Sequence, residues 1–254
     1  YLFTSLIAAI IILGTIEYNN LLKKKSATPS FGLLLIGQLL LIIGSYSFTY
    51  CSNLSQFNIK THFVEYSDAL FWFFILFTIV SMVYEVLRKK NTPLLNISSN
   101  VFGFVWIGLF INFLVYVRLL AGAQLTLVMF FSLWICDTFA FFFGKNFGKR
   151  KIMPEISPNK TVVGTLSGLI GSMIFIMILA HFSIINLSLI SALILGLITG
   201  GVSQFGDFFE SLLKREVNIK DTSNILSGHG GILDRFDSLA IISPLLLLFV
   251  YIVR

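Results

Sequence analysis

The strongest constraint on the fold is a series of long, nearly uncharged apolar segments. A membrane-spanning helix needs about 20 apolar residues, within a range of about 17 to 25. Eight candidate segments occur: Tyr1–Ile16, Phe31–Phe48, Ala69–Leu87, Val101–Leu120, Leu125–Phe143, Thr165–Phe182, Ile184–Phe205 and Ser238–Val253. Their apolar residues are continuous rather than alternating, which argues against barrel strands. The sequence therefore predicts an all-α, polytopic transmembrane helical bundle of about eight spans.

Composition supports this prediction. Hydrophobic residues make up 56% of the 254 residues and charged residues only 12%, and a soluble protein could not bury so much apolar surface. The two cysteines have no spacing that predicts a zinc site or a disulfide framework. Because the chain begins with Tyr1 rather than Met, we expect the natural chain to start earlier, with room for a further helix.

Basic residues are concentrated on one side of the predicted spans. The loops after the first, third, fifth and seventh spans hold 15 of the 18 Lys and Arg residues. The three on the other side are Lys60, Arg118 and Arg254. Cytoplasmic loops of membrane proteins are enriched in Lys and Arg, so we place these four loops in the cytoplasm. The net charge of +6 then reflects topology and contact with anionic lipid, and it does not predict a nucleic-acid partner.

Acidic residues are concentrated in the second half of the chain. Eight of the 12 Asp and Glu residues fall between Asp137 and Asp237, at or near the cytoplasmic ends of the fifth and seventh spans or in the loops that follow. We therefore expect residues 1–124 to be transmembrane scaffold helices and residues 125–254 to be the catalytic region of one continuous membrane domain. A polar site at the cytoplasmic surface follows from this division.

The segment 203–215, SQFGDFFESLLKR, places four polar residues on one helical face. Ser203, Asp207, Glu210 and Lys214 are separated by four, three and four positions. A carboxylate this close to the membrane is unfavourable unless it is paired, hydrated or bound to a metal, which makes Asp207 a functional candidate. A structural Asp–Lys pair at a helix end is the alternative.

The segment 218–237 is predicted to be a Gly-rich loop that enters the last helix. Glycines such as Gly230 allow tight turns and close approach of backbone N–H groups to a ligand. His229 is a ligand, a hydrogen-bond donor or an ordinary loop residue. Asp234 and Asp237 are three positions apart and share a face once the helix has begun.

Asp207, Asp221, Asp234 and Asp237 together offer four carboxylates on one side of the membrane. Oxygen ligands of this kind suit Mg²⁺, whose coordination is often completed by phosphate oxygens. The sequence therefore predicts a magnesium-dependent site for a phosphorylated substrate.

The segment 136–168 adds basic residues to this picture. Asp137 lies in the last turns of the fifth span, and Lys145 and Lys160 follow beside Gly and Thr residues that could also bind phosphate. The cluster 149–151 is more simply explained by membrane topology. Carboxylates, cations and flexible loops at a membrane surface suit a reaction between a polyphosphate and a lipid head group.

These three segments resemble the phosphatidate cytidylyltransferase family, whose members are also called CDP-diacylglycerol synthases. The family signature is similar to S-x-x-K-R-x(4)-K-D, then a short spacer, then H-G-G-x-x-D-R-x-D. Residues 211–237 read SLLKREVNIKDTSNILSGHGGILDRFD. The runs SQFGDFFES, DTFAFFFGKNFG and ISPNKT are also similar to the family. Val163 stands where members usually have Glu, and Ser227 where many have Pro.

The resemblance implies transfer of CMP from CTP to phosphatidate, which gives CDP-diacylglycerol and pyrophosphate in phospholipid biosynthesis. It implies an integral enzyme of the bacterial cytoplasmic membrane whose active site faces the cytoplasm. Mg²⁺ is the expected cofactor, with a second cation as an option. The expected partners are CTP, phosphatidate and membrane lipid, and the family also implies a homodimer.

Residue chemistry and the resemblance together assign roles to individual side chains. The expected metal ligands are Asp207, Asp234 and Asp237. The expected catalytic residues are Asp221, Asp234, Asp237 and Lys220. The expected substrate-binding residues are Asp137, Lys145, Lys160, Ser203, Lys214, Arg215, His229, Gly230 and Arg235.

Three other functions stay open at this point. A CTP-dependent polyprenol or phytol kinase would attack the γ-phosphorus with an alcohol and would need a general base. A transporter or channel would use the acidic residues as a cation pathway, although it should carry polar residues at mid-membrane. An inactive family member is the third alternative, because Val163 departs from the family pattern.

Overall fold

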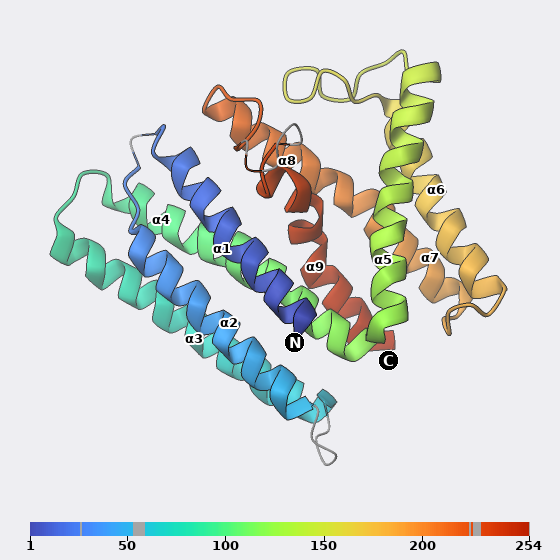
Figure 1. Ribbon diagram of the computed structural model, residues 1–254. Helices are drawn as coiled ribbons and strands as arrows, with labels where there is room; N and C mark the ends of the chain where they lie inside the picture. Colours follow the sequence, from blue (N-terminus) through green and yellow to red (C-terminus); the bar gives the residue numbers. More distant parts are fainter. Residues whose placement is uncertain (26, 53–58, 224, 226–229, 254) are drawn as a thin grey trace. The chain divides into compact units, whose positions relative to one another are not determined.

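The computed structural model of the protein is helical and describes residues 1–254 except 26, 53–58, 224, 226–229 and 254. The elements are shown in Figure 1 and follow in this order: α1 (Leu2–Leu22), α2 (Phe31–Ser52), α3 (Ile59–Arg88), α4 (Pro93–Gly103), η1 (Phe104–Phe110), α5 (Ile111–Phe147), α6 (Val162–His181), α7 (Leu189–Leu197), η2 (Ile198–Val202), α8 (Ser203–Glu216) and α9 (Leu233–Val253). Among the described residues, 7 helical segments are long and apolar enough to cross a membrane. The predicted all-α transmembrane fold is confirmed.

Several helix boundaries differ from the prediction; for example, α3 begins at Ile59 and α8 ends at Glu216. The predicted fourth and fifth spans are confirmed as two helices within Pro93–Phe147, which meet at a kink at Gly122 with φ 78° and ψ 175°. A residue without a Cβ atom adopts such a φ at little cost, so the chain bends there without a loop. The last helix begins at Leu233 rather than Ser238. Asp234 and Asp237 therefore lie in its first two turns.

The chain forms two compact units. The first comprises Tyr1–Leu120 and Asp221–Leu233, and the second comprises Ala121–Lys220 and Asp234–Arg254. The predicted functional division between residues 124 and 125 remains a prediction.

The first unit buries both aromatic and polar side chains. Phe104 of η1 is completely buried and stacks on Phe77 of α3, with ring centroids 4.2 Å apart. The buried Ser45 hydroxyl donates to Asn112 Oδ1 at 2.8 Å, and its Oγ lies 2.9 Å from the Tyr116 hydroxyl oxygen. Polar groups inside a membrane bundle need internal partners of this kind, so these contacts fix how α2 and α5 meet.

Small residues bring the helices of the second unit close together. A Cβ atom added to Gly168 of α6 would lie 2.8 Å from the carbonyl oxygen of Cys136 in α5. One added to Gly196 of α7 would lie 2.6 Å from the Cα atom of Met173 in α6. Such glycines allow close backbone contact where lipid supplies no hydrophobic driving force between helices.

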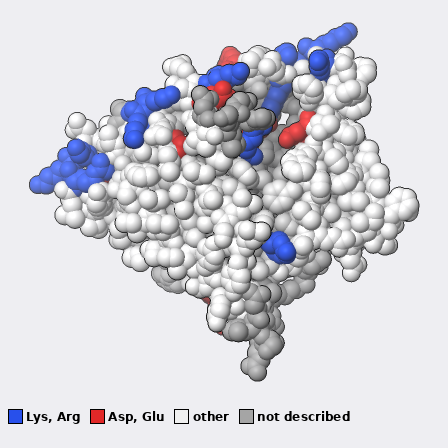
Figure 2. Space-filling model, in the orientation of Figure 1, with Lys and Arg blue, Asp and Glu red and all other residues white. Residues whose placement is uncertain are grey.

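The exposed surface is largely apolar. Most of the face in Figure 2 carries neither basic nor acidic side chains, and large residues such as Trp72, Phe141 and Ile190 are 66%, 70% and 74% exposed. A surface of this kind is stable in contact with lipid. The chain is therefore an integral membrane protein.

Candidate active site

A cavity of about 590 Å³ lies in the second unit, where the end of α5, the start of α6, their connecting loop and α8 come together. Its charged lining residues are Asp137, Lys145, Lys151, Lys160 and Asp207. Four of these were predicted as site residues, whereas Lys151 was assigned to topology. Three cations around a cavity of this size can neutralise a polyphosphate.

Glycine and threonine residues bring the α5–α6 loop against the end of α5. A Cβ atom on Gly148 would lie 2.2 Å from the carbonyl oxygen of Gly144 and 2.3 Å from Thr161 Oγ1, so only glycine fits there. The Ile152 N–H donates to the Lys160 carbonyl at 3.2 Å. Thr161 Oγ1 accepts from the Gly164 N–H at 3.1 Å and caps α6. These contacts fix Lys160 at the cavity.

Four charged residues of the second unit form one group, the Asp207 cluster: Asp137 of α5, Lys160 of the α5–α6 loop, Asp207 of α8 and Asp237 of α9. Lys160 forms an ion pair with Asp207 and lies 4.3 Å from the centre of the Phe208 ring. Asp207 is an electrostatic neighbour of both Asp137 and Asp237. Three helices thus bring the carboxylates of Asp137, Asp207 and Asp237 near one lysine.

Asp237 has a carboxylate oxygen that fits a cation. The residue is only 5% exposed, and its Oδ1 accepts from the Ser238 N–H at 2.6 Å. Its Oδ2 is buried with no hydrogen-bond partner among the described residues. A buried carboxylate oxygen without a partner is unfavourable. A hard cation such as Mg²⁺ would satisfy it and could be bound by both Asp237 and its neighbour Asp207.

The described side chains alone do not form a complete metal site. Within the part of the chain that the structure describes, no three His, Cys, Asp or Glu side chains are arranged as ligands of one ion. Carboxylates beside ion-paired lysines are nevertheless the chemistry that a Mg²⁺–polyphosphate complex needs, because phosphate oxygens and water complete its octahedral shell. The side chains present therefore fit such a complex.

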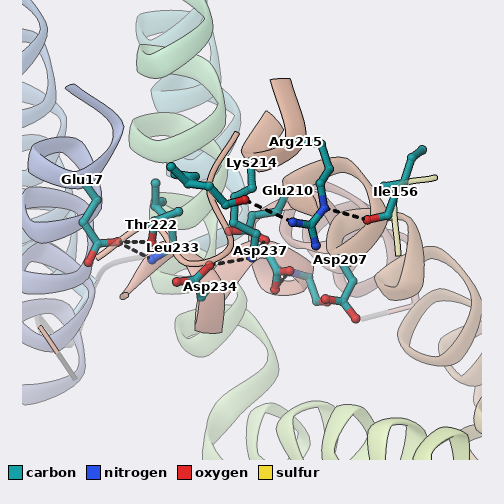
Figure 3. Close-up of polar contacts among 12 residues, drawn as sticks. Glu17, Ile156, Asp207, Glu210, Lys214, Arg215, Thr222, Leu233, Asp234 and Asp237 are labelled. Atoms are coloured by element: carbon teal, nitrogen blue, oxygen red, sulfur yellow. Dashed lines mark hydrogen bonds and ion pairs between the residues drawn. The ribbon is translucent and has the colours of Figure 1, made fainter. Parts of the chain in front are cut away.

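Lys214 lies between two carboxylates in a second group, the Lys214 cluster, with Glu210 and Asp234. Its Nζ atom is 2.5 Å from Glu210 Oε2 and 2.7 Å from Asp234 Oδ1 (Figure 3). The side chains of Glu210, Asp234 and Lys214 are 3%, 8% and 12% exposed. Asp234 was predicted as a metal ligand, but in the structure it is an ion-pair partner of Lys214. Glu210 was not assigned a role, although its spacing from Lys214 indicates the pair.

Both clusters result from the way α8 packs against α9. Asp207 and Glu210 are three positions apart on α8, as are Asp234 and Asp237 on α9, so each pair shares a helix face. Asp207 neighbours Asp237, whereas Glu210 neighbours Asp234. Residues further along α8 thus meet earlier residues of α9.

Gly206 allows α8 and α9 to come this close. A Cβ atom there would lie 2.7 Å from the Cα atom of Ser238 and 2.8 Å from the carbonyl oxygen of Asp237. Both neighbours are backbone atoms and cannot rotate away, so a larger residue must separate the helices.

We therefore expect Gly206→Ala to destabilise the protein by about 1 to 3 kcal/mol, the usual result of overpacking. Turnover should fall as well, because Asp237 moves away from Asp207. The midpoint of thermal unfolding in detergent and the turnover rate measure the two effects. Gly201→Ala is the matched control, because its nearest neighbour would be Leu169 Cδ1 at 3.5 Å. Equal stability of the two variants would contradict the close contact.

Other predicted residues have structural partners or open positions. Arg215 donates from Nε to the Ile156 carbonyl at 3.3 Å, which ties the end of α8 to the α5–α6 loop (Figure 3). Ser203 is buried and donates to the Thr199 carbonyl at 2.5 Å within its own helical turn. Lys145 is exposed, with its Nζ atom 5.7 Å from the centre of the Phe141 ring. Substrate contacts by these three side chains stay predictions.

The remaining predicted residues lie around the end of the signature. Lys220 and Arg235 are exposed in the second unit, and Asp221 is exposed in the first. Gly230 has a φ of 80°, which favours glycine. His229 lies outside the described residues. The prediction that all four aspartates converge is thus supported for Asp207 and Asp237 in one cluster, while Asp234 belongs to the other.

Comparison with known proteins adds independent information. Residues 1–253 match the sequence model of a family described as the cytidylyltransferase family. The phosphatidate cytidylyltransferase of Bacillus subtilis (strain 168) is 35% identical over 251 residues, which cover 96% of this chain and 87% of the relative. The Staphylococcus saprophyticus protein of the same name is 38% identical over 172 residues, or 68% of this chain and 66% of the relative. The match to the Bacillus subtilis protein covers nearly the whole chain and therefore includes the segments that form both clusters.

Proposed function

The chain belongs to the cytidylyltransferase family, and we propose that it transfers CMP from CTP to phosphatidate at the cavity and the two clusters of the second unit. Relatives named phosphatidate cytidylyltransferase, similar over most of the chain, support this activity. The observation that carries the site is the meeting of Asp137, Asp207 and Asp237 with Lys160 beside the cavity.

The charges of the cavity favour the polyphosphate of CTP as its occupant. Lys145, Lys151 and Lys160 line it, and ammonium groups bind phosphate oxygens strongly once water is excluded. Lys160 is already held by Asp207, so its orientation is fixed before substrate arrives. The apolar exposed helices leave phosphatidate free to approach from the lipid with its head group at the same depth.

The reaction joins two anions, so charge neutralisation is its main requirement. A phosphate oxygen of phosphatidate attacks the α-phosphorus of CTP, the bond between that phosphorus and the bridging oxygen to the β-phosphorus breaks, and pyrophosphate leaves. The nucleophile is already anionic, so no strong general base is needed. Fixed cations such as Lys160 reduce the repulsion and align the attack on the phosphorus.

We propose that Asp207 and Asp237 hold Mg²⁺ and that Asp234 assists through Lys214. When bound, the ion would neutralise phosphate oxygens and the charge on the departing pyrophosphate. A second cation near Asp221 is a further proposal. Asp137 is an electrostatic neighbour of Asp207 and, like Asp207, of Lys160, and it would orient Lys160 or water in the ion's shell.

The proposed location is the bacterial cytoplasmic membrane, with the site facing the cytoplasm. The bacterial relatives and the basic loops at the site support this orientation. A homodimer is also proposed, and the mass of the purified protein in detergent would test it.

The activity itself can be measured directly. CTP labelled at the α-phosphorus is incubated with the purified protein and phosphatidate, with and without Mg²⁺. We expect label in the lipid and one pyrophosphate released for each labelled lipid, in both cases dependent on Mg²⁺. Label transferred only from the γ-phosphorus to phytol or a polyprenol would instead indicate a kinase. Failure of both reactions in well-folded protein would contradict the proposal.

A further inference from the structure

Glu17 is a charged side chain in the apolar helix α1, and it is completely buried. Its carboxylate accepts four hydrogen bonds from one segment of the first unit. Oε1 accepts from Ser223 Oγ at 2.5 Å and from the Ile232 N–H at 2.8 Å. Oε2 accepts from Thr222 Oγ1 at 3.1 Å and from the Leu233 N–H at 2.8 Å (Figure 3). Each oxygen thus has two donors, which fills its hydrogen-bonding capacity.

These four bonds explain why a carboxylate can lie inside the unit. A buried charge is strongly unfavourable unless hydrogen bonds replace its hydration. Two of the donors, the N–H groups of Ile232 and Leu233, lie at the start of α9, where the first N–H groups of a helix lack partners within it. An anion is also favoured at this end by the helix dipole. Glu17 and the segment therefore stabilise each other.

Gly231 is part of the same arrangement. A Cβ atom on this residue would lie 2.6 Å from both carboxylate oxygens of Glu17 and 2.2 Å from Thr222 Oγ1. Gly230 before it has a φ of 80°, which L-residues with a side chain rarely adopt. The glycines of the signature thus let the backbone turn and reach Glu17. Sequence reasoning assigned this approach to a ligand instead.

The anchored segment leads directly into the charged residues of α9. Glu17 binds residues 222 and 223 at one end and residues 232 and 233 at the other. Asp234 follows Leu233 immediately, and Asp237 lies on the next turn of the same helix. Fixing the first N–H groups of a helix limits the fraying of its first turn, where Asp234 lies.

We propose that Glu17 is a positioning residue for the reaction. It holds the chain at residues 222–223 and 232–233 so that α9 begins at a fixed residue and presents Asp234 and Asp237 in a single orientation. This role rests on the proposed function, because it concerns the carboxylates that the function uses. Glu17 itself contacts the segment and not the substrates.

The test is Glu17→Gln in the full-length protein, purified in detergent and supplied with CTP, phosphatidate and Mg²⁺. In either orientation, the amide NH₂ group faces one of the two donor pairs, and a backbone N–H cannot rotate away. We expect kcat to fall roughly 10- to 100-fold, as for other residues that orient ligands from behind, with KM for CTP little changed. Hydrogen exchange at the Ile232 or Leu233 amide should become faster.

Two comparisons separate positioning from general destabilisation. Glu65→Gln is the matched control, because the Glu65 side chain on α3 is 75% exposed, and it should leave kcat and exchange unchanged. Thr222→Val removes one donor to Glu17 without changing shape, so we expect a smaller loss of kcat. Combined with Glu17→Ala it should add no further loss, since both changes break the same contact.

The outcomes are distinct. Slower turnover with faster exchange at residues 232 and 233 supports the anchor. Wild-type kcat in Glu17→Gln, or a slower kcat with unchanged exchange, overturns it. If Glu17→Gln does not fold, Thr222→Val decides by the same two measurements. Wild-type protein that is inactive on CTP and phosphatidate would instead refute the proposed function, and exchange would still show whether Glu17 holds the segment.

Discussion

Asp234→Asn is expected to reduce turnover by roughly 10³-fold or more, the scale seen when one charge-stabilising group is removed from an active site. The amide keeps the shape of the side chain but removes its charge. Among the described residues, Lys214 then keeps Glu210 as its ion-pair partner and loses Asp234, whose Oδ1 lies 2.7 Å from the Lys214 Nζ atom in the structure. The Lys214 ammonium group would then pair with Glu210, which would change the electrostatic potential at the start of α9.

The measurement is the initial rate of label transfer from CTP into lipid across a range of Mg²⁺ concentrations. Lys149→Ala is the control, because Lys149 is exposed and does not line the cavity. It should change the rate by less than about twofold, as expected for a surface charge. A wild-type rate in Asp234→Asn would remove Asp234 from the site, and loss of activity in Lys149→Ala would show that the cluster 149–151 contacts substrate.

Much of the fold follows from hydropathy alone. Spans of about 20 apolar residues must be helical in lipid, because every backbone polar group needs an internal partner there. Val101–Leu120 and Leu125–Phe143 were predicted as two spans, and two helices do meet at a kink between them. Hydropathy could not predict that the conformation of Gly122 alone makes this break, because it carries no information about a backbone angle.

The candidate site was predictable where spacing and chemistry coincide. Asp207, Asp234 and Asp237 were predicted as site residues because carboxylates near a membrane are unfavourable unless they are paired, hydrated or bound to a metal. Their partners were not predictable, because pairing depends on the register of α8 against α9, which Gly206 allows. Glu17 was missed for a similar reason. It lies about 200 residues from its donors, and the sequence shows it only as an acidic residue directly after the predicted span Tyr1–Ile16.

Lys214→Met should have the largest effect on stability, about 3 to 5 kcal/mol, the usual result when one partner of a buried ion pair is removed. The Lys214 side chain is 12% exposed and contacts the carboxylates of both Glu210 and Asp234. Methionine keeps the length and apolar stem of lysine but leaves two buried carboxylates facing each other. Glu210 Oε1 already lacks a hydrogen-bond partner among the described residues, so the charge has little other compensation.

A second substitution tests whether Lys214→Met loses stability through electrostatic repulsion or through poorer packing. It removes one of the charges that Lys214 neutralises. Glu210→Gln combined with Lys214→Met removes one of the two facing carboxylates, so the unfolding midpoint should recover part of the loss. Turnover should not recover, because Asp234 still lacks its lysine. Lys149→Met, the same substitution at an exposed position, should leave the midpoint nearly unchanged. If the double variant is less stable than Lys214→Met, then repulsion between the carboxylates is not what destabilises the protein, and lost packing of the lysine stem explains the effect.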